Sequence, residues 1–267
     1  MTPYDLTGRT ALVTGGAQGL GAGMAEALAR AGAAVVIGDV QKEAGGETAR
    51  SLRESGATVE FVPLDVAEDA SWESAVGQIV TELGGLDIVV NNAGVLASGL
   101  IADFEPQAVS EMLEVNVLGV ALGIKHAFRA MRPGGPAGDG GAVVNVSSVA
   151  ATVPFPGIAG YAATKAGVDR LTRVAALESG KLGYGVRVNC VYPGLVPTAM
   201  GIQLARDMEE LGLWPSAEAA VGEVIGLTPL GRLGEVNDMA DAVVFLASDA
   251  ARFVTGAGLP VDGGMGM

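Results

Sequence analysis

The 267-residue sequence contains one cysteine, Cys190, and one histidine, His126. A single cysteine cannot form a disulfide within the chain, and we expect it to be buried on a strand. One residue of each type cannot supply the Cys₂His ligands of a catalytic zinc site, and we predict no metal site. A lone histidine and the lack of a Gly-x-Ser-x-Gly motif disfavour a Ser-His-Asp hydrolase. His126 falls on a long predicted helix, where we expect it at a surface or an interface.

Positive charge is also scarce, because 16 Lys and Arg residues stand against 30 Asp and Glu, for a net charge of −14. This balance argues against nucleic acid or an anionic membrane as a partner, and we interpret the charge as aiding solubility. Residues 1–9 lack the features of a signal peptide. The longest uncharged stretches, 140–164 and 188–205, contain Asn, Pro, Thr and Gly and are not spanning helices. We expect a cytoplasmic protein with no membrane partner.

Glycine and apolar residues are abundant: there are 41 glycines, and 49% of the residues are hydrophobic. Apolar runs typical of buried strands alternate with amphipathic helical segments along the whole chain. The predicted strands cover residues 10–14, 34–38, 58–64, 86–90, 143–148, 186–191 and 259–261. This alternation predicts an α/β fold: a Rossmann-type, doubly wound parallel sheet of about seven strands with helices on both faces, in a single domain over residues 1–267.

Two helical segments carry additional expectations. Pro106 can open a long helix that reaches about Met131 and contains Asn116. Residues 199–226 are helical but irregular, and they mix apolar side chains with acidic ones. The segment 195–228 could therefore act as a substrate-binding lid, or residues 199–226 could be an ordinary amphipathic helix pair; the sequence leaves both possibilities open.

A glycine-rich turn, Thr14–Gly21, follows the first predicted strand and opens a helix. Such a turn lets backbone amides and a helix N-terminus approach a pyrophosphate, and its strand and helix supply the context that the motif requires. Asp39 ends the second strand, where an acid accepts hydrogen bonds from adenosine ribose hydroxyls and repels a 2′-phosphate. Val40 and Gln41, which follow, are uncharged. The sequence therefore favours NAD(H) over NADP.

Tyr161 and Lys165 are four residues apart on a predicted helix, so their side chains share one face with Cβ atoms about 5–6 Å apart. An ammonium that close favours the phenolate, and lowering the tyrosine pKa from about 10 to about 7 would make it useful at neutral pH. Ser148 ends the buried strand 143–148 upstream. On an isolated helix the tyrosine and lysine would more often form a surface contact, so the surrounding motifs decide the interpretation.

Together these motifs resemble the short-chain dehydrogenase/reductase family, over nearly the whole chain from Thr14 to Gly264. The resemblance rests on Thr14-Gly15-x-x-x-Gly19-x-Gly21, Asn91-Asn92-Ala93-Gly94, Asn116, Ser148, Tyr161-x-x-x-Lys165, Pro193-Gly194, Pro229-Leu230-Gly231-Arg232 and Val261-Asp262-Gly263-Gly264. The glycine spacing resembles the compact reductase branch and not the extended branch of epimerases and dehydratases. The Tyr-to-Lys spacing differs from the wider one in enoyl reductases of this fold.

The resemblance implies an oxidoreductase that transfers a hydride between a nicotinamide and a secondary alcohol or ketone. By analogy, Tyr161 is the general base in alcohol oxidation and the general acid in carbonyl reduction. Lys165, with the nicotinium charge, would lower the pKa of Tyr161 and bind the nicotinamide ribose. Ser148 would donate a hydrogen bond to the substrate oxygen. Asn116 would hold a water beside Lys165.

The resemblance also assigns binding residues. The cofactor candidates are Gly15, Gln18, Gly19, Leu20, Gly21, Asp39, Val40, Asp65, Val66, Asn91, Ala93, Gly94, Tyr161, Lys165, Pro193, Gly194, Val196 and Thr198. The substrate candidates are Ser148, Val95, Phe155, Tyr161, Leu195, Met200, Leu204 and Trp214. Most of the second set are apolar, so we expect a hydrophobic small molecule such as a hydroxysteroid, a terpene or an alicyclic alcohol.

Other functions remain open at this point. A 3-oxoacyl-thioester or polyol reductase of the same family is one alternative, and a non-catalytic dinucleotide-binding scaffold is another. Members of the family are usually homotetramers, and the small apolar faces of the predicted helices 106–131 and 160–181 agree with that assembly. We therefore expect a homotetramer.

Overall fold

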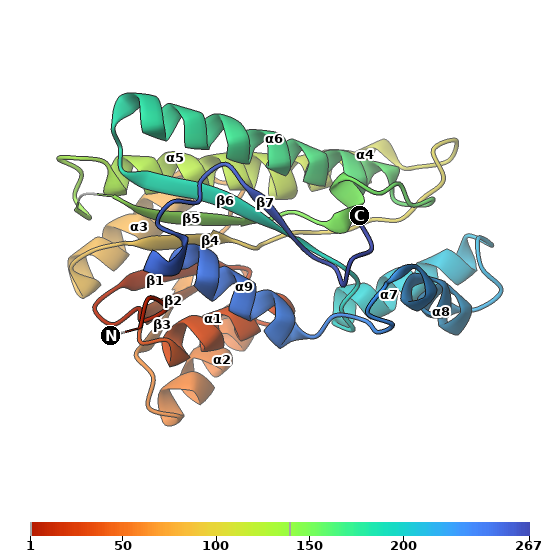
Figure 1. The fold of residues 1–267 in the computed structure, drawn as a ribbon, viewed down its shortest axis with the longest axis horizontal. Helices are drawn as coiled ribbons and strands as arrows, with labels where there is room; N and C mark the ends of the chain where they lie inside the picture. The colour runs from red at the N-terminus through yellow and green to blue at the C-terminus, as the bar shows by residue number, and fades with distance from the viewer. Residues whose placement is uncertain (1, 139) are drawn as a thin grey trace.

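The computed structural model describes residues 2–138 and 140–267. Seven parallel strands form one sheet in the order β3-β2-β1-β4-β5-β6-β7 (Figure 1). The strands are β1 (Thr10–Thr14), β2 (Ala34–Asp39), β3 (Val59–Pro63), β4 (Ile88–Asn91), β5 (Gly141–Val146), β6 (Val186–Pro193) and β7 (Gly258–Val261). The strand order reverses between β1 and β4, and doubly wound sheets bind ligands outside the carboxyl ends of the strands at such a point. The predicted fold is confirmed.

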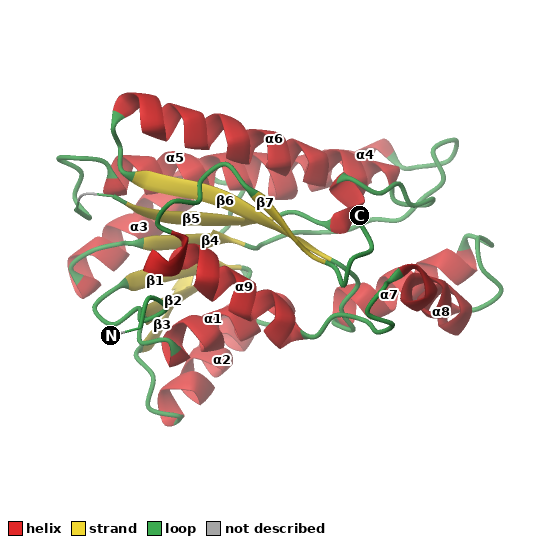
Figure 2. Ribbon diagram, viewed as in Figure 1, coloured by secondary structure: helices red, strands yellow, loops and turns green. Residues whose placement is uncertain are grey.

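Helices cover both faces of the sheet (Figure 2). One layer holds α1 (Gly19–Arg30), α2 (Lys42–Glu54) and α9 (Val236–Ala247), and the other holds α3 (Asp69–Leu83), α4 (Pro106–Leu113), α5 (Gly119–Met131) and α6 (Ala159–Leu182). Successive strand residues face opposite layers: Val13 packs in the core under α1 and α9, whereas Leu12 packs in the core under α3 and α5. The inner strands are therefore buried on both sides, which explains their continuous apolar runs.

The predicted helix 106–131 is interrupted by a π-helical turn, Glu114–Leu118, between α4 and α5. Asn116 lies in this turn and is 0% exposed. Its Oδ1 accepts a hydrogen bond from the Val95 N–H, and its Nδ2 donates to the Val95 carbonyl, each at 2.8 Å. A π turn inserts one residue without breaking the helix, so the apolar periodicity in the sequence did not reveal it.

The stretch Pro106–Met131 is also the one helical segment, within the described part of the chain, that is long and apolar enough to cross a membrane. Length and composition alone are weak grounds for a span, because core helices pass the same test. In this structure α5 packs against α3 and α6, and Ala127 and Met131 join the core.

His126 is not at the surface, contrary to the prediction. Its ring stacks on Trp72 with the ring centres 6.2 Å apart, and its Nε2 lies 2.8 Å from Asp69 Oδ1. The side chain is buried because α5 packs face to face with α3, a neighbour that helix periodicity does not identify. Cys190 is buried on β6, as predicted.

The irregular helical region resolves into two helices, α7 (Ala199–Glu210) and α8 (Ala217–Leu227), which project beyond the carboxyl ends of the strands (Figure 1). Each begins at a capping hydroxyl: Thr198 accepts from the Gly201 N–H, and Ser216 accepts from the Ala219 N–H. The break between them explains the irregular pattern in the sequence. A lid function for this pair stays a prediction.

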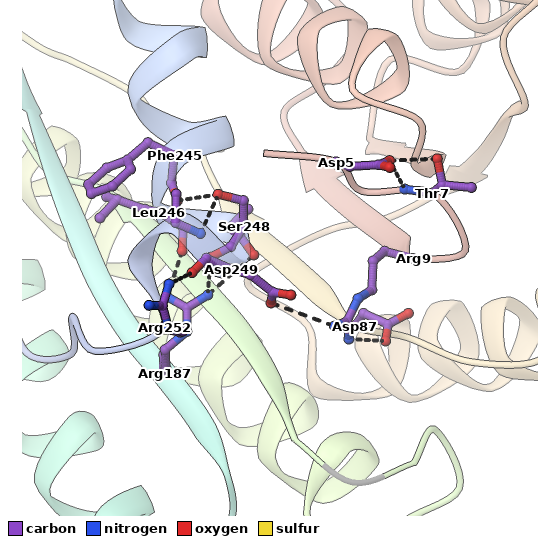
Figure 3. A network of polar contacts seen from close by, with 12 residues as sticks. Asp5, Thr7, Arg9, Asp87, Arg187, Phe245, Leu246, Ser248, Asp249 and Arg252 are labelled. Carbon is purple, nitrogen blue, oxygen red and sulfur yellow. Dashed lines mark hydrogen bonds and ion pairs between the residues drawn. The ribbon is translucent and has the colours of Figure 1, made fainter. Parts of the chain in front are cut away.

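At the amino ends of the strands, a polar network links the sheet to α9 (Figure 3). The Arg187 guanidinium on β6 donates to the carbonyls of residues 246–248 at 2.7 to 3.2 Å. These carbonyls end α9 without partners inside the helix, so the guanidinium caps its negative end. Arg9 pairs with Asp87 at 3.2 Å and with Asp249 at 3.8 Å. The network fixes the strand ends that lie away from the site.

Candidate active site

A cleft of about 610 Å³ lies across the carboxyl ends of the strands and extends under α7 and α8. Residues from the whole length of the chain line it, and they include almost every predicted site residue. The predicted residues in the lining are Gly15, Gln18, Gly19, Leu20, Gly21, Asp39, Val40, Asp65, Val66, Ala93, Gly94, Val95, Ser148, Phe155, Tyr161, Lys165, Pro193, Gly194, Leu195, Val196, Thr198, Met200, Leu204 and Trp214. Asn91 and Asn116 are the exceptions.

The glycine turn shapes one end of the cleft. Gly15 and Gly19 have φ angles of +63° and +58°, in the left-handed region that favours glycine. A Cβ on Gly21 would lie 2.1 Å from the carbonyl oxygen of Gly15, so the turn closes only with hydrogen at that position. Helix α1 starts at Gly19, and the N-cap residue Gln18 makes no side-chain capping bond. The amino end of α1 therefore offers free backbone N–H groups to an anion such as a pyrophosphate.

Asp39 lies at the end of β2, on the wall of the same part of the cleft. Its Oδ2 accepts a hydrogen bond from the Ala17 N–H at 3.0 Å, and its Oδ1 accepts one from the Gln41 N–H at 2.9 Å. These two bonds hold a carboxylate that is 6% exposed, and they leave lone pairs for hydroxyl donors. Among the described cleft residues Lys165 is the only base, so none is placed to neutralise a phosphate beside Asp39.

Tyr161 and Lys165 lie on the same side of α6. The Lys165 Nζ is 5.5 Å from the centre of the Tyr161 ring and donates to the Val146 carbonyl at 2.9 Å. Ser148 follows β5 and does not end it; its Oγ accepts from the Ala150 N–H at 3.1 Å. The Ser148 side chain also lies close enough to the Tyr161 hydroxyl to act on its pKa. Three polar groups thus meet at one point of the cleft.

Burial sets the acidity of this pair. Loss of hydration raises the pKa of Tyr161 to about 12, although the hydrogen bond with Ser148 acts in the opposite direction. Burial also lowers the pKa of Lys165 to about 8, because the charged ammonium loses its hydration. The expectation that a nearby ammonium makes this phenol acidic is not met by the chain on its own. Desolvation outweighs the attraction between the two groups.

The lowered pKa of Lys165 predicts a pH-dependent stability. Between its folded pKa of about 8 and its ordinary value of 10.5, the unfolded chain holds a proton on this lysine that the folded chain lacks. Raising the pH through this window therefore stabilises the fold. We expect the free energy of unfolding of the wild type to gain roughly 2 kcal/mol relative to Lys165→Met between about pH 7.5 and about pH 9.5.

Urea unfolding at the two pH values measures this gain. Lys181→Met is the matched control, because it removes the same charge from an exposed position on α6 and should leave the pH dependence of the wild type unchanged. Parallel stability profiles for the wild type and Lys165→Met would contradict the burial argument.

Asn91 does not line the cleft, although the sequence placed it among the cofactor residues. Its side chain is buried between the sheet and α5, where Nδ2 donates to Asn145 Oδ1 at 2.8 Å. Side chains alternate along a strand, so Asn92 faces the cleft in its place. The Asn92 Nδ2 donates to the carbonyls of Thr14 and Gly15, at 2.9 and 3.1 Å, and so links this turn to the glycine loop.

Asn116 also lies outside the lining, but it is close to Lys165. A Cβ at Gly94 would lie 3.2 Å from Asn116 Oδ1 and 3.4 Å from Lys165 Nζ, so glycine lets the two side chains approach. Besides its two bonds to Val95, Asn116 Nδ2 donates to Thr164 Oγ1 at 3.1 Å. These bonds give Asn116 a direct part in holding the loop after β4 against α6.

The part of the cleft beside Tyr161 is an apolar chamber. Tyr161, Phe155 and Trp214 pack there in one cluster with the buried side chains of Met208 and Ala220. Several residues of the cleft lining are not among those predicted from the sequence: Asn92, Glu111, Val115, Ala205, Met208, Ala220, Val221, Glu223, Val224, Leu227 and Met265. Most of them lie on α4, α7 and α8 or at the carboxyl end of the chain. Only their amphipathic spacing could have identified them, and spacing does not say which surface they face.

Metal chemistry has no candidate centre in the described residues, where no three His, Cys, Asp or Glu side chains gather to hold an ion. The polar groups of the cleft are hydroxyl, ammonium, carboxylate, amide and backbone groups. They can exchange protons and hydrogen-bond to a nucleotide and to an oxygen-bearing substrate.

The sequence matches a family model described as "Enoyl-(Acyl carrier protein) reductase" over residues 15–266. A trans-4-hydroxycyclohexanecarboxylate dehydrogenase of Sinomonas cyclohexanicum is 38% identical over 96% of this chain and 92% of its own. A 3-alpha-(or 20-beta)-hydroxysteroid dehydrogenase of Mycobacterium bovis is 38% identical over 97% of this chain and 90% of its own. A cyclopentanol dehydrogenase of a Comamonas species is 36% identical over 96% of each chain.

Solved structures show the same fold. An NAD⁺-bound xylitol dehydrogenase has a TM-score of 0.91 and 29% identity, covering 97% of this chain and 99% of that one. A gluconate 5-dehydrogenase of Burkholderia cenocepacia, in complex with NADP and tartrate, has a TM-score of 0.84 and 34% identity, covering 98% and 97%. The similarities extend over nearly the full length of every chain. This protein belongs to the short-chain dehydrogenase/reductase family.

Proposed function

We propose that this protein is an NAD(H)-dependent dehydrogenase that interconverts a hydrophobic secondary alcohol and its ketone. Its class, an oxidoreductase acting on CH–OH groups, follows from its family and from relatives that are named dehydrogenases of secondary alcohols. One observation carries the finer proposal. Tyr161, Lys165 and Ser148 meet where a cleft suited to a dinucleotide opens into an apolar chamber.

The chain's own groups account for the proton chemistry. A bound nicotinamide would accept or supply the hydride. Tyr161 would take the proton of the substrate hydroxyl in alcohol oxidation and return it in ketone reduction. Ser148 would donate a hydrogen bond to the same oxygen, on which negative charge develops. Lys165 would place an ammonium beside the phenol and bind the nicotinamide ribose. Because burial raises the pKa of Tyr161, oxidation should become faster as the pH rises.

The proposed binding of the cofactor follows the cleft from end to end. The amino end of α1 and the turn Gly15–Gly21 would hold the pyrophosphate, and Asp39 would accept hydrogen bonds from the adenosine ribose. Asp65 and Val66 would border the adenine. Val196 and Thr198 would fix the carboxamide of the nicotinamide. All of these residues line the cleft, which supports this proposal.

The preference for NAD over NADP predicts a change of specificity on substitution of Asp39. Asp39→Ala removes the carboxylate that would repel a 2′-phosphate, so the ratio of kcat/KM for NAD to that for NADP should fall by at least about tenfold. Steady-state kinetics with both cofactors measure this ratio. Asp65→Ala, a control at a second acid of the cleft, should change the ratio much less. Faster turnover of the wild type with NADP than with NAD would contradict the proposal.

The apolar chamber favours a hydrophobic substrate, and the segment 195–228 is proposed as the lid over it. A polyol is the second candidate, because the structural relatives include a xylitol and a gluconate dehydrogenase. A panel of cyclopentanol, cyclohexanol, a 3-hydroxysteroid, xylitol and gluconate separates the two. We expect reduction of NAD with the ring alcohols. Much higher turnover of the polyols would overturn the hydrophobic assignment.

We also propose a homotetramer in the cytoplasm. Leu113 and Leu118 at the π turn, and Val174 and Leu177 on α6, are exposed apolar side chains on adjacent helices. Their burial between subunits would remove this surface from water. Light scattering coupled to size exclusion should give a mass of about four chains, and a monomer at micromolar concentration would refute the assembly.

A further inference from the structure

The charges in the cleft are strongly unequal. Four of its described lining residues are acids, Asp39, Asp65, Glu111 and Glu223, and one is a base, Lys165. Asp39 and Asp65 lie at the ends of β2 and β3, on the proposed adenosine side. Glu223 lies on α8, and hence on the other side of the cleft. Glu111 lies on α4. A substrate in the chamber, whose side chains are mostly apolar, would therefore meet the acidic group of Glu223.

Contacts with Trp214 and the position on α8 place the Glu223 side chain. The Trp214 Nε1–H donates a hydrogen bond to its carboxylate. Trp214 packs in the same apolar cluster as Tyr161 and Phe155, so the carboxylate is attached to the wall that faces the reacting groups. Glu223 also follows the buried Ala220 by three residues, which puts both on the same face of α8. The side chain remains solvent-exposed, at the mouth of the chamber.

Lys165 cannot serve as a counter-charge for an acidic substrate in this chamber. Its Nζ is buried, donates to the Val146 carbonyl, and lies by the ring of Tyr161. An anion at the chamber mouth would thus lose hydration, gain no ion pair, and face the carboxylate of Glu223. Each of these effects is unfavourable. A neutral ring alcohol of the same shape avoids all three.

We propose that the chamber selects uncharged ring alcohols over carboxylate-bearing ones, and that Glu223 is the residue that sets this preference. The inference rests on the proposed alcohol dehydrogenase function and narrows its substrate class. It also separates this chain from its relative in Sinomonas cyclohexanicum, whose named substrate, 4-hydroxycyclohexanecarboxylate, carries a negative charge.

A matched substrate pair tests the preference. trans-4-Hydroxycyclohexanecarboxylate and its carboxamide share the ring and the reacting hydroxyl and differ in charge. We expect kcat/KM with NAD to be larger for the amide by about tenfold or more at low salt. Because Glu223 is exposed, about 0.5 M NaCl should reduce this ratio severalfold. A ratio near one at low salt, or one that salt leaves unchanged, would overturn the proposal.

Glu223→Gln isolates the residue, since the amide oxygen can still accept the hydrogen bond from Trp214. The variant should raise the ratio of kcat/KM for the carboxylate to kcat/KM for the amide severalfold. Glu210→Gln is the control, because it makes the same charge change on the exposed surface of α7, outside the cleft lining. If both variants change kcat/KM for the carboxylate equally, Glu223 acts only through the net charge of the protein. That result would refute its assigned role.

A binding measurement separates failure of this inference from failure of the proposed function. The chain has two tryptophans, and Trp72 is buried under α5, so fluorescence changes on ligand binding report mainly on Trp214. We expect cyclohexanecarboxamide to bind more tightly than cyclohexanecarboxylate in the presence of NAD. If neither ring alcohol is oxidised but this order holds, the redox proposal fails and the charge selection stands. If the carboxylate binds equally well, the charge selection fails whatever the activity.

Discussion

Replacement of Tyr161 by phenylalanine should lower kcat by about 10²–10⁴-fold while the enzyme still binds NAD. The substitution removes one hydroxyl and keeps the ring that packs with Phe155 and Trp214, so the chamber retains its shape. The loss should be similar for oxidation and reduction, because the same hydroxyl takes the proton in one direction and donates it in the other. Stopped-flow or steady-state absorbance of reduced nicotinamide measures both.

Tyr184→Phe provides the control for this variant. Tyr184 packs edge-on against Phe128, with ring centres 5.4 Å apart, and lies outside the cleft lining. Its loss of a hydroxyl should leave kcat within about twofold of the wild type, as for other changes away from a site. Full activity in Tyr161→Phe would refute the assignment of proton transfer to this residue. Loss of NAD binding in the same variant would mean that the ring, and not the hydroxyl, is essential.

Gly21→Ala should strongly weaken both the fold of the glycine turn and the binding of NAD that is proposed there. The added Cβ would lie 2.1 Å from the carbonyl oxygen of Gly15 and 2.6 Å from Asn92 Nδ2. Backbone cannot yield as a flexible side chain can, so the glycine turn and the first turn of α1 must move apart. We expect a loss of about 1–3 kcal/mol in stability, as for other overpacked sites. We also expect kcat/KM for NAD to fall by about 100-fold, because the amides no longer converge on the pyrophosphate.

Gly77→Ala is the matched glycine control. Gly77 lies in the middle of α3, and a Cβ there would meet nothing within 4 Å. Alanine favours the helix over glycine, so this variant should be more stable than the wild type by up to about 1 kcal/mol and equally active. Thermal unfolding and cofactor titration on both variants give the comparison. A fully active Gly21→Ala enzyme would show that the loop relaxes around the added methyl group.

The local patterns that set the fold are visible in the sequence. Buried strands read as apolar runs because parallel sheets have two covered faces, and glycines mark turns that need a positive φ or a close approach. The predicted strand 10–14 matches β1, and the predicted helix 160–181 matches α6 to within one residue at each end. The offset of four residues between Tyr161 and Lys165 likewise determines that they share a side of α6. Each of these features depends on residues that are near one another in the chain.

Features that depend on distant parts of the chain were decided by tertiary structure. His126 is buried only because α3 packs beside α5. The hydrogen bond of the Asn91 side chain requires β5 beside β4. The raised pKa of Tyr161 requires surrounding side chains that exclude water. The carboxylate of Glu223 lines the cleft from α8 and accepts a hydrogen bond from Trp214, which lies in the preceding loop. Desolvation and side-chain packing act between segments that only the fold brings together. The sequence alone therefore determined the family and the candidate catalytic residues, whereas their acidity and the charges that line the cleft came from the packed structure.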